Sequence, residues 1–101
     1  MFWNKKKKDV SLLPFFNLPP NTAVFSCCHV FVEGQPILRV SHDSEGDWQF
    51  LCGRNHDISN AMIVGLDEVV SLDPTVNETA YLDCGCSVER KSAEEKWEEC
   101  R

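Results

Sequence analysis

The sequence predicts an α+β fold, with an antiparallel sheet of about five strands in meander order and two or three short helices. Three observations support this prediction. Short runs rich in Val and Phe alternate with Gly-containing turns as far as residue 65. Apolar residues at helical spacing and helix-start signals follow after that point. A run of strands followed by helices is typical of a sheet with helices packed on one side.

The predicted strands are defined by their composition and by the turns between them. Gly34 and the polar stretch 43–47 mark the first two turns, because Gly adopts backbone angles that other residues avoid. Alternation within the third strand places Trp48, Phe50 and Cys52 on one face. Strands are expected over 23–32, 37–42, 48–52, 61–65 and 86–90.

Two helices are expected in the middle of the second half. Residues 66–72 carry apolar side chains at close to helical spacing. Asp73 and Pro74 then start a second helix, because Asp caps helix N-termini and Pro is favoured at the first helical position. We expect this second helix to run to about Leu82.

A third helix is predicted at the C-terminus. Ser92 and Glu95 have the spacing of a capping box, in which each side chain satisfies a free N–H at the start of a helix. Trp97 would then lie on the buried side of that helix. Its exposed side would carry an acidic patch of Glu94, Glu95, Glu98 and Glu99.

The chain divides into a leading segment and one domain. Residues 1–20 are expected to be a basic tail followed by an apolar, Pro-containing arm, and residues 21–101 a single α+β domain. The apolar run of the arm is about seven residues and contains Pro14, too short for a signal peptide or a bilayer span, so we expect a cytoplasmic protein. The arm either packs on the domain or contacts a partner. If it packs, deleting residues 1–20 should lower the melting temperature by several degrees.

Acidic side chains dominate the predicted domain. The whole chain has a net charge of −6, but Lys5 to Lys8 are clustered near the N-terminus, and residues 21–101 carry fifteen acidic against six basic side chains. Such a surface repels nucleic acid and anionic membranes. It speeds encounter with a basic protein. A basic protein partner is therefore expected, and neither nucleic acid nor a membrane.

The cysteines allow two interpretations. Free Cys behaves as a small apolar residue, and most of these six lie in predicted core strands, which favours reduced, buried thiols with no cofactor. The alternative is a zinc site, to which His29 and His56 could also contribute. The paired C-x₂-C spacing of structural zinc sites is missing. The cysteines of this alternative are Cys27, Cys52, Cys84 and Cys86.

No catalytic site is predicted. A nucleophilic Cys needs an electropositive setting to become a thiolate, whereas the cysteines here lie in apolar strands or beside acidic residues. Asp43, Glu45 and Asp47 share one hairpin loop, but the Glu that completes a calcium-binding loop is missing. We therefore expect a protein that is not an enzyme.

Several motifs resemble a known group of proteins. Gly46-Asp47-Trp48-Gln49-Phe50 follows a predicted hairpin, an Asp73-Pro74 pair follows the Leu66 segment, and Gly85 precedes Arg90 by five residues. This order, over residues 23–91, resembles small bacterial domains of unknown function that are placed among the immunity proteins of polymorphic toxin systems. This chain has Val88 where the family ending prefers Ala. The resemblance implies a strand meander with no enzyme activity and no catalytic residues.

The functional hypothesis combines this resemblance with the acidic surface. We expect a non-enzymatic protein-binding module that neutralises a basic toxin or enzyme through acidic residues around an aromatic anchor. The alternatives are the zinc or thiol-based structural module and a domain whose ligand the sequence does not indicate. The residues expected to contact the partner are Asp43, Glu45, Asp47 and Trp48 on the hairpin and Glu94, Glu95 and Glu98 near the C-terminus.

Overall fold

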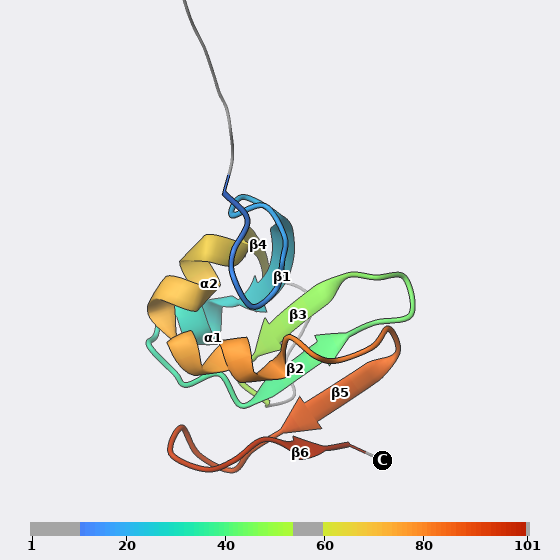
Figure 1. The fold of residues 1–101 in the computed structure, drawn as a ribbon. Coiled ribbons are helices and arrows are strands. Elements are labelled where there is room, and N and C mark those ends of the chain that lie inside the picture. The colour runs from blue at the N-terminus through green and yellow to red at the C-terminus, as the bar shows by residue number, and fades with distance from the viewer. Residues whose placement is uncertain (1–10, 54–59, 101) are drawn as a thin grey trace, which may run out of the picture.

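The computed structural model describes residues 11–53 and 60–100 and confirms the α+β class (Figure 1). Within these residues a mixed six-stranded sheet is combined with two α-helices and a 3₁₀ helix. The strands are β1 (Ala23–Cys27), β2 (Arg39–His42), β3 (Trp48–Leu51), β4 (Ala61–Gly65), β5 (Cys86–Glu89) and β6 (Glu98–Glu99). The helices are α1 (Cys28–Phe31), α2 (Leu66–Leu72) and the 3₁₀ helix η3 (Pro74–Thr79).

The sheet is not the predicted meander. Its strand order is β4-β1-β3-β2-β5-β6, and every neighbouring pair is antiparallel except β1 and β3. β1 runs parallel to β3, with Phe25 opposite Gln49. The predicted strand over 23–32 ends at Cys27, because the chain turns into the single-turn helix α1 there. The chain therefore cannot form a hairpin directly after β1, and β2 pairs on the far side of β3.

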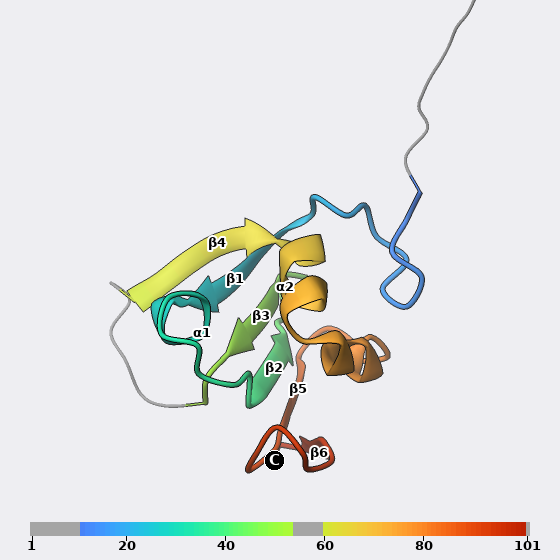
Figure 2. The ribbon, with the colours of Figure 1, turned by 90° about the vertical axis from the view of Figure 1, so that its left-hand side faces the viewer.

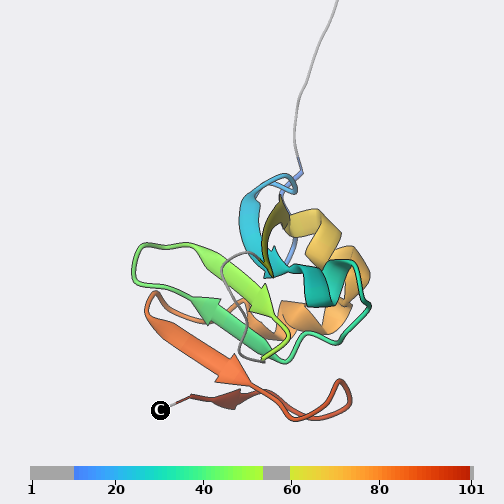
Figure 3. The ribbon, with the colours of Figure 1, turned by 180° about the vertical axis from the view of Figure 1, so that it is seen from behind.

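The helices α2 and η3 and the arm lie on the same face of the sheet (Figures 1 and 2). Helix α2 begins as expected after Gly65, whose backbone N–H donates to the Glu68 side chain at 2.7 Å. Asp73 caps η3 by accepting a hydrogen bond from the Thr75 backbone N–H at 3.0 Å. The predicted second helix thus starts at Pro74, but it is a 3₁₀ helix that ends at Thr79. Figure 3 shows the opposite face, formed by the strands.

The predicted C-terminal helix is wrong. Ser92 closes only one turn, by accepting a hydrogen bond from the Glu95 backbone N–H at 3.1 Å, and the chain then enters β6. β6 pairs antiparallel with β5, and the Cys100 N–H donates to the Ser87 carbonyl at 2.9 Å. A short helix is only marginally stable by itself, so pairing with the open edge of β5 is the better source of backbone hydrogen bonds.

The core lies between the sheet and the helices, and the arm closes one end of it. Phe16 is buried and its ring meets Trp48 edge-on, with centroids 5.0 Å apart. By contrast, Leu12 and Phe15 are exposed. The arm therefore packs on the domain through part of its apolar side chains. The fully buried large side chains of the core are Phe50, Ile37, Leu66, Val24, Val30, Val40, Val69, Val76 and Val88.

Candidate functional site

Two of the motif residues, far apart in the sequence, form a buried ion pair. A nitrogen of the Arg90 guanidinium lies 2.7 Å from Asp73 Oδ2, and the Arg90 side chain is 2% exposed. Arg90 also donates twice to the Ile37 carbonyl, at 2.9 and 3.0 Å. These bonds tie the end of β5 to the start of η3 and to the segment before β2. The motif residues Asp73 and Arg90 therefore stabilise the fold.

The remaining donors of Arg90 hold the C-terminal segment. Its Nη1 donates to Thr75 Oγ1 at 3.0 Å and to the Ala93 carbonyl at 3.1 Å. The guanidinium carbon lies 4.0 Å from the centroid of the Trp97 ring, a cation–π contact. Trp97 is thus half-buried as expected, but it reaches the core from an extended segment and not from a helix.

The two motif glycines serve turns. Gly46 has φ +90° at the tip of the β2–β3 hairpin, and Gly85 has φ +89° just before β5. Residues with a Cβ rarely adopt these angles. The Gly85 N–H also donates to the His42 carbonyl at 2.6 Å, which fixes the start of β5 beside β2. These motif positions, too, have structural roles.

Not all of the predicted contact residues on the hairpin are available to a partner, because Asp43 bonds within the hairpin loop. Asp43 accepts hydrogen bonds from the backbone N–H groups of Asp47 (3.0 Å) and Glu45 (2.9 Å) and from the Gln49 amide (3.2 Å). These bonds hold the pKa of Asp43 below its ordinary value of 3.8, and the bond from the Asp47 backbone N–H contributes most. Glu45 and Asp47 have exposed side chains. Trp48 is buried, with its ring stacked on His42 at 4.1 Å, so it offers no exposed aromatic anchor.

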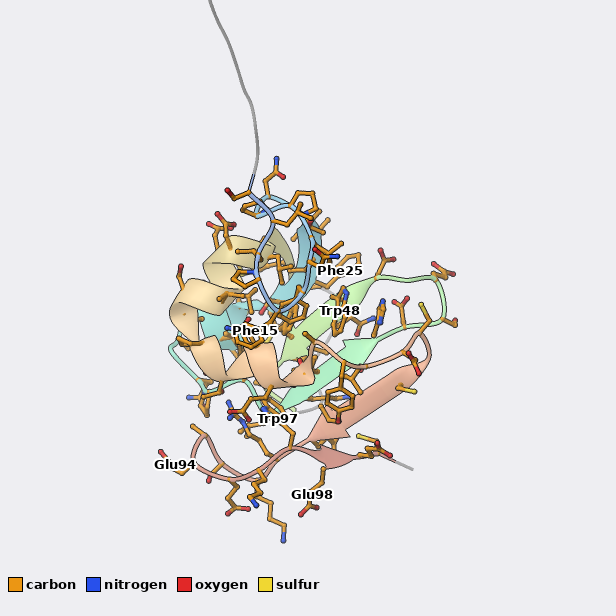
Figure 4. The ribbon with its side chains drawn as sticks, in the orientation of Figure 1. Phe15, Phe25, Trp48, Glu94, Trp97 and Glu98 are labelled. Atoms are coloured by element: carbon orange, nitrogen blue, oxygen red, sulfur yellow. The ribbon has the colours of Figure 1, made fainter. Side chains whose placement is uncertain are left out.

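The C-terminal patch is exposed throughout. Glu94, Glu95 and Glu98 are all exposed, as is Glu99. Figure 4 shows Glu94 and Glu98 pointing away from the body of the protein, whereas Trp97 between them points inward. The four carboxylates thus lie along the outer edge of the sheet, on β6 and the turn before it.

The described surface contains few cations to balance its carboxylates. Residues 11–53 and 60–100 contain fourteen acidic side chains and four Lys or Arg. Two of those cations are paired, Arg39 with Glu89 and Arg90 with Asp73. The twelve exposed carboxylates are Glu33, Glu45, Asp47, Asp67, Glu68, Glu78, Asp83, Glu89, Glu94, Glu95, Glu98 and Glu99.

The four cysteines of the zinc alternative do not come together. Cys84 and Cys86 are exposed beside the β2–β3 hairpin. Cys86 lies opposite His42 in the backbone register of β5 and β2. Cys84 Sγ lies 3.7 Å from His42 Nε2. Cys27 and Cys52 are buried near the opposite end of β3. None of the described cysteines forms a disulfide.

Cys27 and Cys52 instead share a cluster with His29. One ligand atom from each of these three residues lies within 4.8 Å of the other two. Cys52 Sγ is 3.7 Å from His29 Nδ1. His56, also considered as a ligand from the sequence, lies outside the described residues.

Comparisons with known proteins give no family to which the chain can be assigned. No model of a protein family matches it, and the searches of curated proteins and of solved structures found no match. Among the described residues, none of the helices is long and apolar enough to cross a membrane.

Proposed function

We propose that this protein is a non-enzymatic binding module that holds a basic protein partner on an acidic surface. The observation that carries the proposal is the excess of exposed carboxylates: twelve are exposed, while two of the four described cations are already paired. Complementary charge steers a basic partner toward such a surface and disfavours binding of acidic proteins. A cytoplasmic location, with no membrane or nucleic-acid partner and no cofactor in this role, belongs to the same proposal.

The C-terminal patch is the main contact surface in this proposal. The side-chain carboxylates of Glu94, Glu95 and Glu98 accept no hydrogen bond among those found in the described part of the chain, so they are available to a partner. Asp43, in contrast, is used by its own hairpin loop. The patch also lies on β6, a two-residue edge strand that ends the sheet. Glu45 and Asp47 of the hairpin would add long-range attraction.

The resemblance to immunity proteins supports a toxin as the partner. A protein that occupies the substrate site of a basic enzyme needs negative charge on a rigid frame, and the patch is attached to the core through Arg90 and Trp97. The motifs behind the resemblance have structural roles here, and the sheet is not the meander that the resemblance implies, so the acidic surface remains the main support for the proposal.

The test is affinity capture with charge-neutralised variants. The tagged full-length protein and the variant E94Q/E95Q/E98Q are incubated with lysate of the source cells at low and high salt, and retained proteins are identified by mass spectrometry. The affinity of a captured basic protein should fall at least about tenfold in the variant, or about 1.4 kcal/mol. High salt should weaken the wild-type complex, because exposed charges are screened.

The matched control is E33Q/E78Q/D83N, which removes the same number of exposed carboxylates from other elements. This variant should keep most of the affinity. Equal losses in both variants would show that net charge alone drives capture. A partner that is acidic, or that binds E94Q/E95Q/E98Q as tightly as wild type, would contradict the proposal. For a captured toxin, inhibition of its activity by the wild-type protein is the final test.

A further inference from the structure

Two buried thiols and an imidazole come together at the end of the sheet where β1 and β3 terminate. Cys27 is the last residue of β1, His29 lies in α1, and Cys52 directly follows β3. We propose that these three side chains supply three of the four ligands of a zinc-binding site. This inference is independent of the proposed partner binding.

The parallel pairing of β1 with β3 creates the cluster. Because Phe25 lies opposite Gln49 and both strands run in the same direction, the C-terminal ends of β1 and β3 lie side by side. Cys27 and Cys52 are 25 positions apart in sequence but adjacent at these strand ends. The chain turns into α1 immediately after Cys27, which returns His29 to the same point.

The distances match zinc after a small contraction. In a tetrahedral site, bonds of about 2.3 Å to sulfur and about 2.0–2.1 Å to nitrogen place the ligand atoms roughly 3.5–3.8 Å apart. The Cys52 Sγ to His29 Nδ1 distance of 3.7 Å is already in that range. One ligand atom from each side chain lies within 4.8 Å of the other two, so the remaining distances need to shorten by about 1.3 Å or less.

The charges of the proposed site balance. On binding, each of the two thiols releases a proton and becomes a thiolate, while the imidazole stays neutral. Two thiolates and one Zn²⁺ give a site of zero net charge, which suits a region where Cys27 and Cys52 are 0% and 3% exposed. Soft thiolate ligands also favour zinc over magnesium or calcium.

A competing cluster shares His29 but fits zinc less well. Cys28, His29 and Glu33 also bring their ligand atoms within 4.8 Å of one another. However, Glu33 is exposed and strongly hydrated. This set offers one thiolate where the first offers two, so the first is the proposed site.

The experiment is zinc binding to the reduced, full-length protein. The protein is stripped with a chelator, incubated with micromolar ZnCl₂, desalted, and analysed for metal. Wild type should retain one zinc per chain, and its melting temperature should rise with zinc concentration. Cobalt as a probe should give a thiolate-to-metal charge-transfer absorption. Zinc affinity should rise with pH, because two protons are displaced.

The variants C27S, C52S and H29Q should each weaken zinc binding more than about 100-fold, since even loss of an outer-shell contact costs 10–100-fold. Circular dichroism tests whether each variant folds. His29 is only half-buried, so H29Q should still fold if a substitution at buried Cys27 or Cys52 unfolds the protein. The control C84S/C86S removes two exposed thiols and should bind as wild type does.

Three results would overturn the proposal. One is wild-type protein that retains no zinc after desalting. Another is binding that survives in folded H29Q and is lost in C84S/C86S, which would place the metal on the exposed thiols. The third is binding lost in C28S and E33Q but kept in C52S, which would assign it to the competing cluster.

Discussion

Arg90 offers the sharpest test of how the fold is held together. The substitution Arg90→Met keeps most of the aliphatic stem but removes the guanidinium. It leaves the Asp73 carboxylate, whose side chain is 20% exposed, without its cation. It also removes both donors to the Ile37 carbonyl and the cation–π contact with Trp97. Breaking a buried pair in this way costs about 3–5 kcal/mol.

That loss is large for a domain of this size. A chain of about 100 residues has a total stability of roughly 5–15 kcal/mol. A loss of 3 kcal/mol should lower the melting temperature by roughly 12–24 °C. The assay is urea unfolding followed by circular dichroism, with thermal unfolding as a second measurement. The double variant R90M/D73N should be more stable than the sum of the single losses predicts, because the two groups act on each other.

The neighbouring salt bridge supplies the control. Arg39 pairs with Glu89 on the surface, where the two side chains are 35% and 53% exposed. The substitution Arg39→Met should therefore cost at most about 1 kcal/mol. Equal destabilisation by Arg90→Met and Arg39→Met would refute the role assigned to the buried pair. So would a double-mutant cycle in which the losses from Arg90→Met and Asp73→Asn simply add.

Three further predictions concern the arm, the hairpin and the thiols. Phe16→Ala should lower the free energy of unfolding by about 3–5 kcal/mol, measured in urea. Phe15→Ala, at an exposed position, should change that free energy by no more than about 0.5 kcal/mol. Similar losses in the two variants would mean that the arm does not pack as described. Because hydrogen bonds hold the folded pKa of Asp43 below 3.8, its carboxylate stabilises the hairpin above that pH, and the contribution is lost as pH falls through the folded pKa. Carboxyl NMR titration should give a midpoint below 3.8, and a midpoint at or above it would contradict the hairpin geometry. Cys84 and Cys86 should react with a thiol reagent before the buried cysteines do, as mass mapping of early adducts would show.

The site could be predicted only in part. Residue types and charge identified the acidic residues, and Glu94, Glu95 and Glu98 are exposed as that hypothesis requires. Trp48 is an expected anchor at the same surface, but its apolar ring fills the core beside Phe50, on the face where the alternation of β3 places both residues. The pairing of Asp73 with Arg90 also escaped prediction, since the sequence presents the two residues as separate motifs.

The sequence by itself determined the local elements. Polar residues around Gly46 specified the β2–β3 hairpin, alternation specified β3, and Asp73-Pro74 specified the start of η3, because each depends on residues within a few positions. Only the tertiary structure decided which strands pair. The parallel β1–β3 pair and the sheet edge that replaced the C-terminal helix both depend on contacts between distant segments. Alternation is the same in parallel and antiparallel strands, so no local pattern could place Cys27 beside Cys52.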